Sequence, residues 1–317
     1  MKIVFLDAFT VDPGGKMLEP LSELGDLVIY DYTPYDKIAE RASDAEILIV
    51  NKCSIDAGVI PFLKKLKFVC VAATGYNNVD IALLKQRQIP VSNVRGYSSY
   101  SVAQMVFASL LAVRNKVEYY FGETKKGRWC ETPHFSFYDH DIIEFAGEVF
   151  GIVGYGDIGR KVATIADAMG CKVVVNTAHP ELYHSEPFDF VQFDELVSTS
   201  DIISLHCPLT SETADLINHR VLTKMKPTAT LINTSRGGLI NENSLYMHLR
   251  DNPDFTAILD VLSTEPPSDM NPLLYLSNCF ITPHQAWTGK KSRARLIESI
   301  GSNIQGFISG RLQNIVN

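Results

Sequence analysis

The sequence predicts an α/β protein of two domains, each with a parallel sheet. Three observations carry this prediction. The chain has 317 residues, more than one hydrophobic core usually organises. Short apolar runs rich in Val and Ile alternate with amphipathic stretches, as in strands joined by crossover helices. The turn-linked hairpins that an antiparallel sheet would need are not seen in this alternation.

The composition narrows the class of protein. Hydrophobic residues make up 46% and charged residues 21%, as in ordinary globular proteins. A net charge of -7, with no cluster of Lys and Arg, argues against nucleic acid as a partner. No apolar run approaches the roughly 18 residues of a membrane span, and the N-terminal run is too short for a signal peptide. A cytoplasmic protein without membrane attachment, disulfides or a metal site is therefore expected, since the six cysteines form no C-x-x-C pair.

Two series of strands are predicted. The first hundred residues contain Lys2–Leu6, Leu27–Tyr30, Glu46–Val50, Phe68–Ala72 and Pro90–Val94. The region from 148 to 283 contains Val149–Val153, Val173–Asn176, Asp201–Leu205, Thr230–Asn233, Thr256–Val261 and Cys279–Thr282. The second series has the six-strand pattern of a doubly wound sheet. A long apolar helix over Ser98–Val113 leads into it, and a last helix near Ser292–Ile308 is expected to return to the first domain.

A glycine loop follows the first strand of the second series. Gly154, Gly156 and Gly159 have the G-x-G-x-x-G spacing, and a helix beginning at Asp157 and Ile158 follows them. The first two glycines permit a tight turn and the approach of a pyrophosphate to backbone N–H groups, and the third allows the helix to pack on the strand. The apolar face predicted for this helix, which stops at Gly170, consists of Ile158, Val162, Ile165 and Met169.

The next strand bears on the choice of cofactor. An NAD-binding site usually has a carboxylate at the end of this strand, but the chain continues from Asn176 with Thr177, Ala178 and His179. The missing charge removes a repulsion against a 2'-phosphate, and His179 is placed to contact one, although it reads equally well as a surface histidine. NADP is admissible and NAD is not excluded.

Chemistry-bearing residues follow three strands of the second series. Arg236, Glu265 and His284 each come after a strand, with Asp260 at the end of the strand before Glu265. Because ligands bind beyond the carboxyl ends of parallel strands, these side chains are expected to share one rim. Any one of them alone is more often a surface or structural group, so the prediction rests on their joint placement.

These residue types suit a 2-keto acid. A guanidinium can bind the carboxylate and polarise the ketone, and an imidazole can exchange a proton with the carbonyl oxygen as hydride moves. A carboxylate beside the imidazole fixes its tautomer and favours the protonated ring. We therefore assign Arg236 to substrate binding, His284 to acid/base catalysis and Glu265 to its support, with Asp260 holding the nicotinamide carboxamide.

Five ordered motifs resemble those of the D-isomer-specific 2-hydroxyacid dehydrogenase family, and the resemblance spans nearly the whole chain. They are the glycine loop at Gly154–Gly159, Leu-His-x-Pro-Leu-Thr at Leu205–Thr210, Asn-x-x-Arg-Gly at Asn233–Gly237, Asp-Val…Glu-Pro at Asp260–Pro266 and Thr-Pro-His at Thr282–His284. The resemblance implies a Rossmann-type dinucleotide-binding domain over 99–285. It also implies a flavodoxin-like substrate-binding domain built from 1–98 and 286–317, and a homodimer through the dinucleotide-binding domain.

The resemblance also implies site residues. Thr74 and Gly75 would offer backbone N–H groups to the substrate carboxylate, with Trp287 near the substrate. Beyond the glycine loop, the implied cofactor contacts are Thr177, His179, Cys207, Pro208, Thr234, Ser235, Arg236, Asp260 and His284.

Within the family, the segments 74–80, 93–98 and 284–287 are most similar to glycerate dehydrogenases, also called hydroxypyruvate reductases. Hydroxypyruvate is therefore the expected substrate, with D-glycerate as product. Thr177 departs from the Asp of NAD-using members, and Glu265 argues against formate dehydrogenases, which have Gln there. The alternatives are another 2-keto acid, or a corepressor-like scaffold that senses a dinucleotide.

Overall fold

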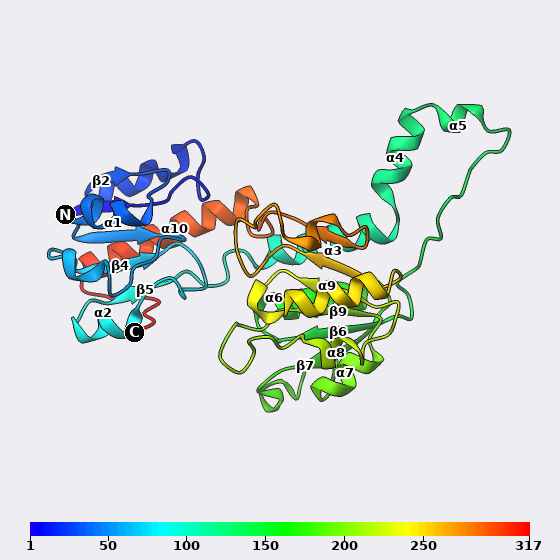
Figure 1. The fold of residues 1–317 in the computed structure, drawn as a ribbon. Helices are drawn as coiled ribbons and strands as arrows, with labels where there is room; N and C mark the ends of the chain where they lie inside the picture. The colour runs from blue at the N-terminus through cyan, green and yellow to red at the C-terminus, as the bar shows by residue number, and fades with distance from the viewer. The chain divides into compact units, whose positions relative to one another are not determined.

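The structure is a computed structural model that describes all residues from 1 to 317. The chain forms two compact units, drawn in Figure 1. The first consists of Met1–Ser98 and Thr288–Asn317, so both termini belong to it, and the second is Ser99–Trp287. None of the helices combines the length and apolar character that crossing a bilayer requires.

The first unit is built on a five-stranded parallel sheet of order β2-β1-β3-β4-β5. Its strands are β1 (Lys2–Phe5), β2 (Asp26–Ile29), β3 (Ile47–Val50), β4 (Phe68–Val71) and β5 (Val91–Ser92). Every residue of β3 and β4 is buried, which explains why these strands read as continuous apolar runs rather than alternating ones. The chain order changes direction between β1 and β3, and a ligand is expected at such a switch point.

Helices cover this sheet, and the last one comes from the far end of the chain. They are η1 (Lys16–Leu24), α1 (Tyr35–Ala42), η2 (Ile60–Phe62), α2 (Ile81–Gln86) and α10 (Lys290–Ile308). Helix α10 packs on β4, where the Phe307 and Phe68 rings stack with centroids 4.7 Å apart. The buried Asn303 of α10 also donates to the Asn93 carbonyl at 3.0 Å. The predicted return of this helix to the first domain is confirmed.

The second unit contains a seven-stranded parallel sheet of order β12-β11-β10-β9-β6-β7-β8. Its strands are β6 (Val149–Val153), β7 (Lys172–Asn176), β8 (Asp189–Phe190), β9 (Ile202–Leu205), β10 (Thr230–Asn233), β11 (Thr256–Leu259) and β12 (Cys279–Ile281). Six strands were predicted, and β8 was missed because two residues carry no readable periodicity. The predicted doubly wound α/β class is confirmed, with the switch point between β6 and β9.

The helices of the second unit pack around this sheet. They are α3 (Ser99–Arg114), α4 (Val117–Lys125), α5 (Arg128–Glu131), α6 (Asp157–Ala168), η3 (Pro180–Tyr183), α7 (Phe193–Thr199), α8 (His219–Leu222), η4 (Gly237–Leu239), α9 (Glu242–Asp251) and η5 (Pro272–Tyr275). The predicted apolar face of α6 was partly wrong, since Ile165 is 36% exposed. The buried stripe instead runs through Gly159, Val162, Ala163 and Ala166. Three of these four residues are small, and a pattern of large apolar side chains does not detect them.

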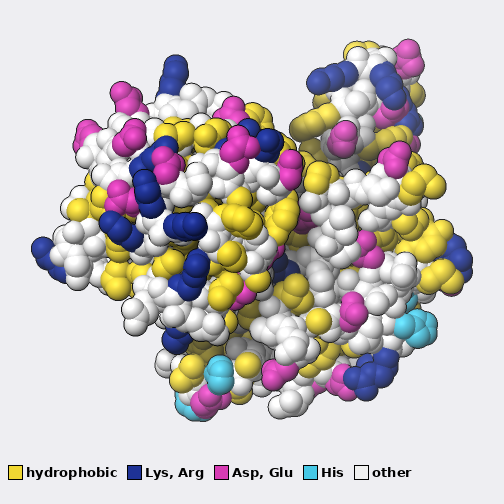
Figure 2. Space-filling view, turned by 60° about the vertical axis from the view of Figure 1, so that its left-hand side comes forward, with side chains coloured by type: hydrophobic (Ala, Val, Ile, Leu, Met, Phe, Trp, Pro, Cys, Tyr) yellow, Lys and Arg dark blue, Asp and Glu magenta, His cyan; other side chains and the backbone are white.

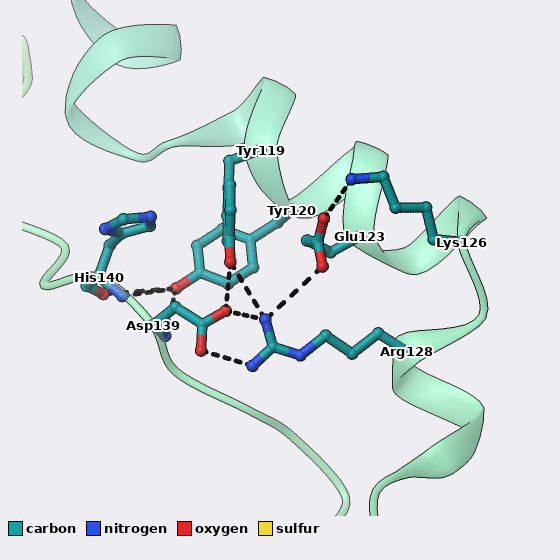
Figure 3. Close-up of polar contacts among 7 residues, drawn as sticks. All are labelled: Tyr119, Tyr120, Glu123, Lys126, Arg128, Asp139 and His140. Carbon is teal, nitrogen blue, oxygen red and sulfur yellow. Dashed lines mark hydrogen bonds and ion pairs between the residues drawn. The ribbon is translucent and has the colours of Figure 1, made fainter. Parts of the chain in front are cut away.

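Helices α4 and α5, with the loop of residues 132–147, form an arm that projects from the rest of the second unit (Figure 1). Neither helix has a buried side chain. The arm is held by its own polar contacts, shown in Figure 3: the Arg128 guanidinium pairs with both oxygens of Asp139, which also accepts from the Tyr119 hydroxyl at 2.6 Å. In Figure 2 the arm stands at the upper right, with basic, acidic and hydrophobic side chains together on its surface.

Candidate active site

The glycine loop is shaped by two close backbone contacts. Gly154 follows β6 with φ of +94°, and a Cβ on it would lie 2.5 Å from the Cys207 nitrogen. A Cβ on Gly159 would lie 2.1 Å from the Gly154 carbonyl oxygen. Both positions therefore require glycine, the first because of its left-handed backbone and its contact with the end of β9, the second because α6 starts against the loop.

Gly156, between them, is open where the others are crowded. No atom lies within 4 Å of a Cβ built on Gly156, and no side chain caps the N-terminus of α6 that it precedes. The N–H groups of the first helical turn, at Asp157 and Ile158, thus have no side-chain cap and lie at the positive end of the helix. A pyrophosphate needs this combination of open space and backbone donors, so the loop fits a dinucleotide.

The end of β7 carries the residues expected near the adenosine ribose. Thr177 follows the strand directly, and His179 is exposed, with its Nδ1 3.2 Å from Glu181 Oε1. The side chain of Asn176, the last residue of β7, donates to the Val191 carbonyl at 3.0 Å. The nearest acidic side chain after the strand is thus Glu181, which already contacts His179.

The loops after β9 and β10 are joined by hydrogen bonds. The Ser235 hydroxyl donates to the Cys207 carbonyl at 2.7 Å, and the buried Asn233 donates to the Arg236 carbonyl at 2.8 Å. The hydroxyl of Thr234 is buried without a partner in the protein. These contacts fix the backbone that carries Arg236, whose Nη1 donates to the Ser235 carbonyl at 2.7 Å.

His206, in the same segment, is a neutral structural group. Burial lowers the pKa of its imidazole from 6.5 to about 3, and its Nε2 lies 2.9 Å from the Ser204 hydroxyl. Pro208 contributes only its carbonyl to the fold, accepting from the Thr213 hydroxyl at 2.7 Å.

The structure places the Arg236 loop, Glu265 and His284 next to one another. A Cβ on Gly237 would lie 2.0 Å from the carbonyl carbon of Leu262, so the Arg236 loop touches the loop after β11. The Leu262 N–H donates to Glu265 Oε1 at 3.0 Å, and Glu265 Oε2 lies 2.6 Å from His284 Nδ1. One carboxylate therefore bridges the backbone of one strand end and the imidazole of the next.

His284 itself has an unusual backbone. Its φ of +50° lies in the left-handed region, and its N–H donates to the carbonyls of Asp260 at 2.8 Å and Thr282 at 2.9 Å. A non-glycine residue keeps such a conformation only where its surroundings enforce it, and such residues concentrate at functional sites.

The carboxylate of Asp260 holds the backbone on both sides of His284. Its carboxylate is 3% exposed and accepts from the Thr282 hydroxyl at 2.6 Å and from the N–H groups of Gln285 and Ala286, both at 2.9 Å. From its sequence position, Asp260 was expected to hold the nicotinamide carboxamide, and its contacts with the His284 segment were not predicted. The only signal for them was the place of an acidic residue at the end of a buried strand. The carboxamide contact stays a prediction.

The remaining predicted residues lie apart in the chain. Thr74 and Gly75 follow β4 in the first unit, where the Thr74 hydroxyl donates to the Val94 carbonyl at 2.9 Å and the Thr74 carbonyl accepts from Asn93 at 2.7 Å. Trp287 is the last residue of the second unit. The substrate contacts of these three residues stay predictions.

Comparison with known proteins decides the family. The model of the D-isomer specific 2-hydroxyacid dehydrogenase, NAD binding domain, matches residues 107–286. The chain belongs to this family. It is 39% identical to a hydroxypyruvate reductase of Blautia hydrogenotrophica over the full length of both proteins. It is also 35% identical to a glycerate dehydrogenase of Methylorubrum extorquens, over 99% of this chain and 98% of that protein.

Solved structures of the family share the fold. An acyclic imino acid reductase, solved with NADPH and D-Arg, is 32% identical with a TM-score of 0.88, over the whole of both chains. The D-lactate dehydrogenase of Aquifex aeolicus, solved with NAD and lactic acid, is 26% identical with a TM-score of 0.85, over 100% of this chain and 99% of that one. The protein is thus a nicotinamide-dependent oxidoreductase of 2-hydroxy and 2-keto acids, as predicted.

The positioning of His284 by the Asp260 carboxylate is tested by substitution of Asp260. Replacing it by Asn keeps the volume, but whichever way the amide is oriented, its NH2 group faces a backbone N–H that the carboxylate now accepts. The His284 segment is expected to shift and kcat to fall roughly 10- to 100-fold, because small displacements of catalytic groups are costly. The exposed Asp254→Asn, just before β11, is the matched control. Wild-type kcat in Asp260→Asn would show that this carboxylate does not position His284.

Proposed function

We propose that the protein interconverts hydroxypyruvate and D-glycerate, using Arg236, Glu265 and His284. The observation that carries the proposal is the 2.6 Å contact between Glu265 and His284, beside the loop that holds Arg236. The similarity to a hydroxypyruvate reductase and to a glycerate dehydrogenase over nearly full length supports the choice of substrate.

Each side chain has a distinct task in this proposal. The Arg236 guanidinium binds the substrate carboxylate and draws electron density from the carbonyl. The His284 ring gives a proton to the carbonyl oxygen in reduction and takes it back in oxidation. Glu265 accepts a hydrogen bond from the Nδ1–H of His284, which fixes the orientation of the ring and leaves Nε2 to face the substrate. The carboxylate also stabilises the positive charge of the protonated ring. NADH or NADPH, when bound at the glycine loop, supplies the hydride.

For the cofactor, we propose that both NADH and NADPH are accepted. Thr177 places no negative charge at the end of β7, so a 2'-phosphate meets no direct repulsion there. The exposed His179 can donate to that phosphate, and Glu181 beside it limits the gain. The related structures solved with NADPH and with NAD are consistent with either dinucleotide.

We also propose a homodimer formed through the second unit. The arm exposes large hydrophobic side chains that no other part of the chain covers: Phe121, Trp129, Phe135, Tyr138, Ile142 and Ile143. Its charged residues pair among themselves, so the arm has its own internal structure without a core (Figure 3). Exposed apolar surface on a structured projection is typical of an interface, and a second copy of the chain is the partner that the family resemblance implies.

The proposed activity is tested by initial rates with NADH and NADPH against hydroxypyruvate, glyoxylate and pyruvate. We expect the highest kcat/KM with hydroxypyruvate, and turnover with both dinucleotides. A higher kcat/KM for glyoxylate or pyruvate would contradict the proposed substrate but not the enzyme class. Dinucleotide binding with no turnover of any keto acid would instead favour a corepressor-like scaffold.

The role of His284 is tested by His284→Asn. Loss of general acid/base catalysis is expected to lower kcat about 10²- to 10⁴-fold while the dissociation constant of NADPH stays within twofold, because the ring acts on the substrate proton. Fluorescence titration of NADPH measures the second quantity. His219→Asn, an exposed histidine of the same unit, should behave as wild type. Full activity of His284→Asn would remove His284 from this role.

The dimer is tested by light scattering after gel filtration. The wild type is expected at twice the chain mass of 35.3 kDa, and Phe121→Ser with Phe135→Ser at one chain mass, because the double variant removes two exposed rings of the arm. Phe62→Ser, which removes an exposed ring of the first unit, is the control. A monomeric wild type, or a double variant that stays dimeric, would contradict the proposed interface.

A further inference from the structure

The residue between the first two glycines of the loop is a buried tyrosine. Tyr155 is 2% exposed, and its ring packs edge-on against Tyr183 and Phe190, with centroids 5.0 Å and 5.3 Å away. Phe188 completes the cluster at 6.3 Å. All three partners belong to the segment that follows β7, so the glycine loop rests on the rings of that segment.

The tyrosine hydroxyl adds a directional contact to this packing. It donates to Glu186 Oε2 at 3.0 Å, in a partly buried position. Burial, with a smaller effect of Glu186, raises the pKa of Tyr155 far above its ordinary value, so the hydroxyl stays a donor. A hydrogen bond to a carboxylate in such surroundings is stronger than one between neutral groups. It fixes Glu186, and the loop around it, relative to the glycine loop.

The loop held in this way also carries the residues at the ribose end of the cofactor site. It starts at Thr177 and His179, the residues proposed to face the 2'-phosphate, and ends at β8. Between these ends, η3 carries Tyr183, whose ring stacks on Phe190 at 5.8 Å. The side chain of Tyr155 therefore joins the glycine loop to the loop of residues 177–190.

We propose that the hydrogen bond between Tyr155 and Glu186 positions the loop of residues 177–190 and so sets how strongly the protein distinguishes NADPH from NADH. The inference rests on the proposed binding of both dinucleotides at the glycine loop. The two cofactors differ only in the 2'-phosphate, so a displaced loop lowers the affinity for NADPH more than that for NADH. Tyr155 and Glu186 are positioning residues, since their side chains bond to each other and are proposed to act through Thr177 and His179.

The experiment measures the dissociation constants of NADPH and NADH by fluorescence titration of the full-length protein. In Tyr155→Phe and in Glu186→Ala, the preference for NADPH over NADH is expected to fall roughly threefold to tenfold, the effect of one hydrogen bond. The double variant should fall no further than either single one. Glu186→Gln, which keeps an acceptor oxygen, should stay within twofold of wild type. Tyr183→Phe removes a hydroxyl from the same ring cluster and is the matched control.

A uniform weakening of both dinucleotides would mean that the hydrogen bond only stabilises the fold, and would overturn the inference. Unchanged constants in Tyr155→Phe would do the same. Should Tyr155→Phe fail to fold, Glu186→Ala against Glu186→Gln decides the matter, because Glu186 is only half-buried. If the wild type binds and uses both cofactors while the preference is insensitive to these changes, the inference alone fails. If it binds neither, the proposed function fails with it.

Discussion

The rim that carries Arg236, Glu265 and His284 depends on one constraint, the hydrogen bonds between the Asp260 carboxylate and the backbone around His284. In a parallel sheet, the N–H groups of the loops beyond the strand ends have no neighbouring strand to bond with. Asp260 satisfies two of them, at Gln285 and Ala286, and also accepts from the Thr282 hydroxyl. With both sides of His284 held, its left-handed backbone is maintained, and the ring is presented to Glu265 in a single orientation.

Close backbone packing carries this constraint to the neighbouring strand ends. Gly237 lets the Arg236 loop lie against Leu262, and the Leu262 N–H holds Glu265. Gly154 lets the dinucleotide loop lie against the end of β9 in the same way. The two glycines thus serve one purpose, because they bring loops from different strands to within contact distance without an intervening side chain. The loops of the site pack on one another, and the side chains of Arg236, Glu265 and His284 extend from that framework.

The features that could be predicted from the sequence are those with a local sequence pattern. Buried strands such as β3 and β6 read as apolar runs, and the glycine spacing, with the strand and helix around it, predicts the glycine loop from the sequence. Arg236, Glu265 and His284 could be named because parallel topology sends the ends of β10, β11 and β12 to one edge. The features that were predicted wrongly or missed have no local sequence pattern. The strand β8 has two residues, and the buried stripe of α6 consists mostly of small residues, Gly159, Ala163 and Ala166.

The roles of buried acidic residues could not be predicted either. In the sequence, a carboxylate that hydrogen-bonds to a distant backbone segment looks the same as one that binds a ligand. The backbone contacts of Asp260 were missed for this reason, and Asp7 in the first unit makes contacts of the same kind. Asp7 follows β1, is buried, and accepts from the N–H groups of Asn51, Lys52 and Cys53 after β3. In both units, an acid after one parallel strand accepts hydrogen bonds from the loop that follows a neighbouring strand of the sheet. Loops beyond a parallel sheet need such internal anions wherever their own N–H groups converge, so an acid at a strand end should be considered as a support before it is considered as a ligand.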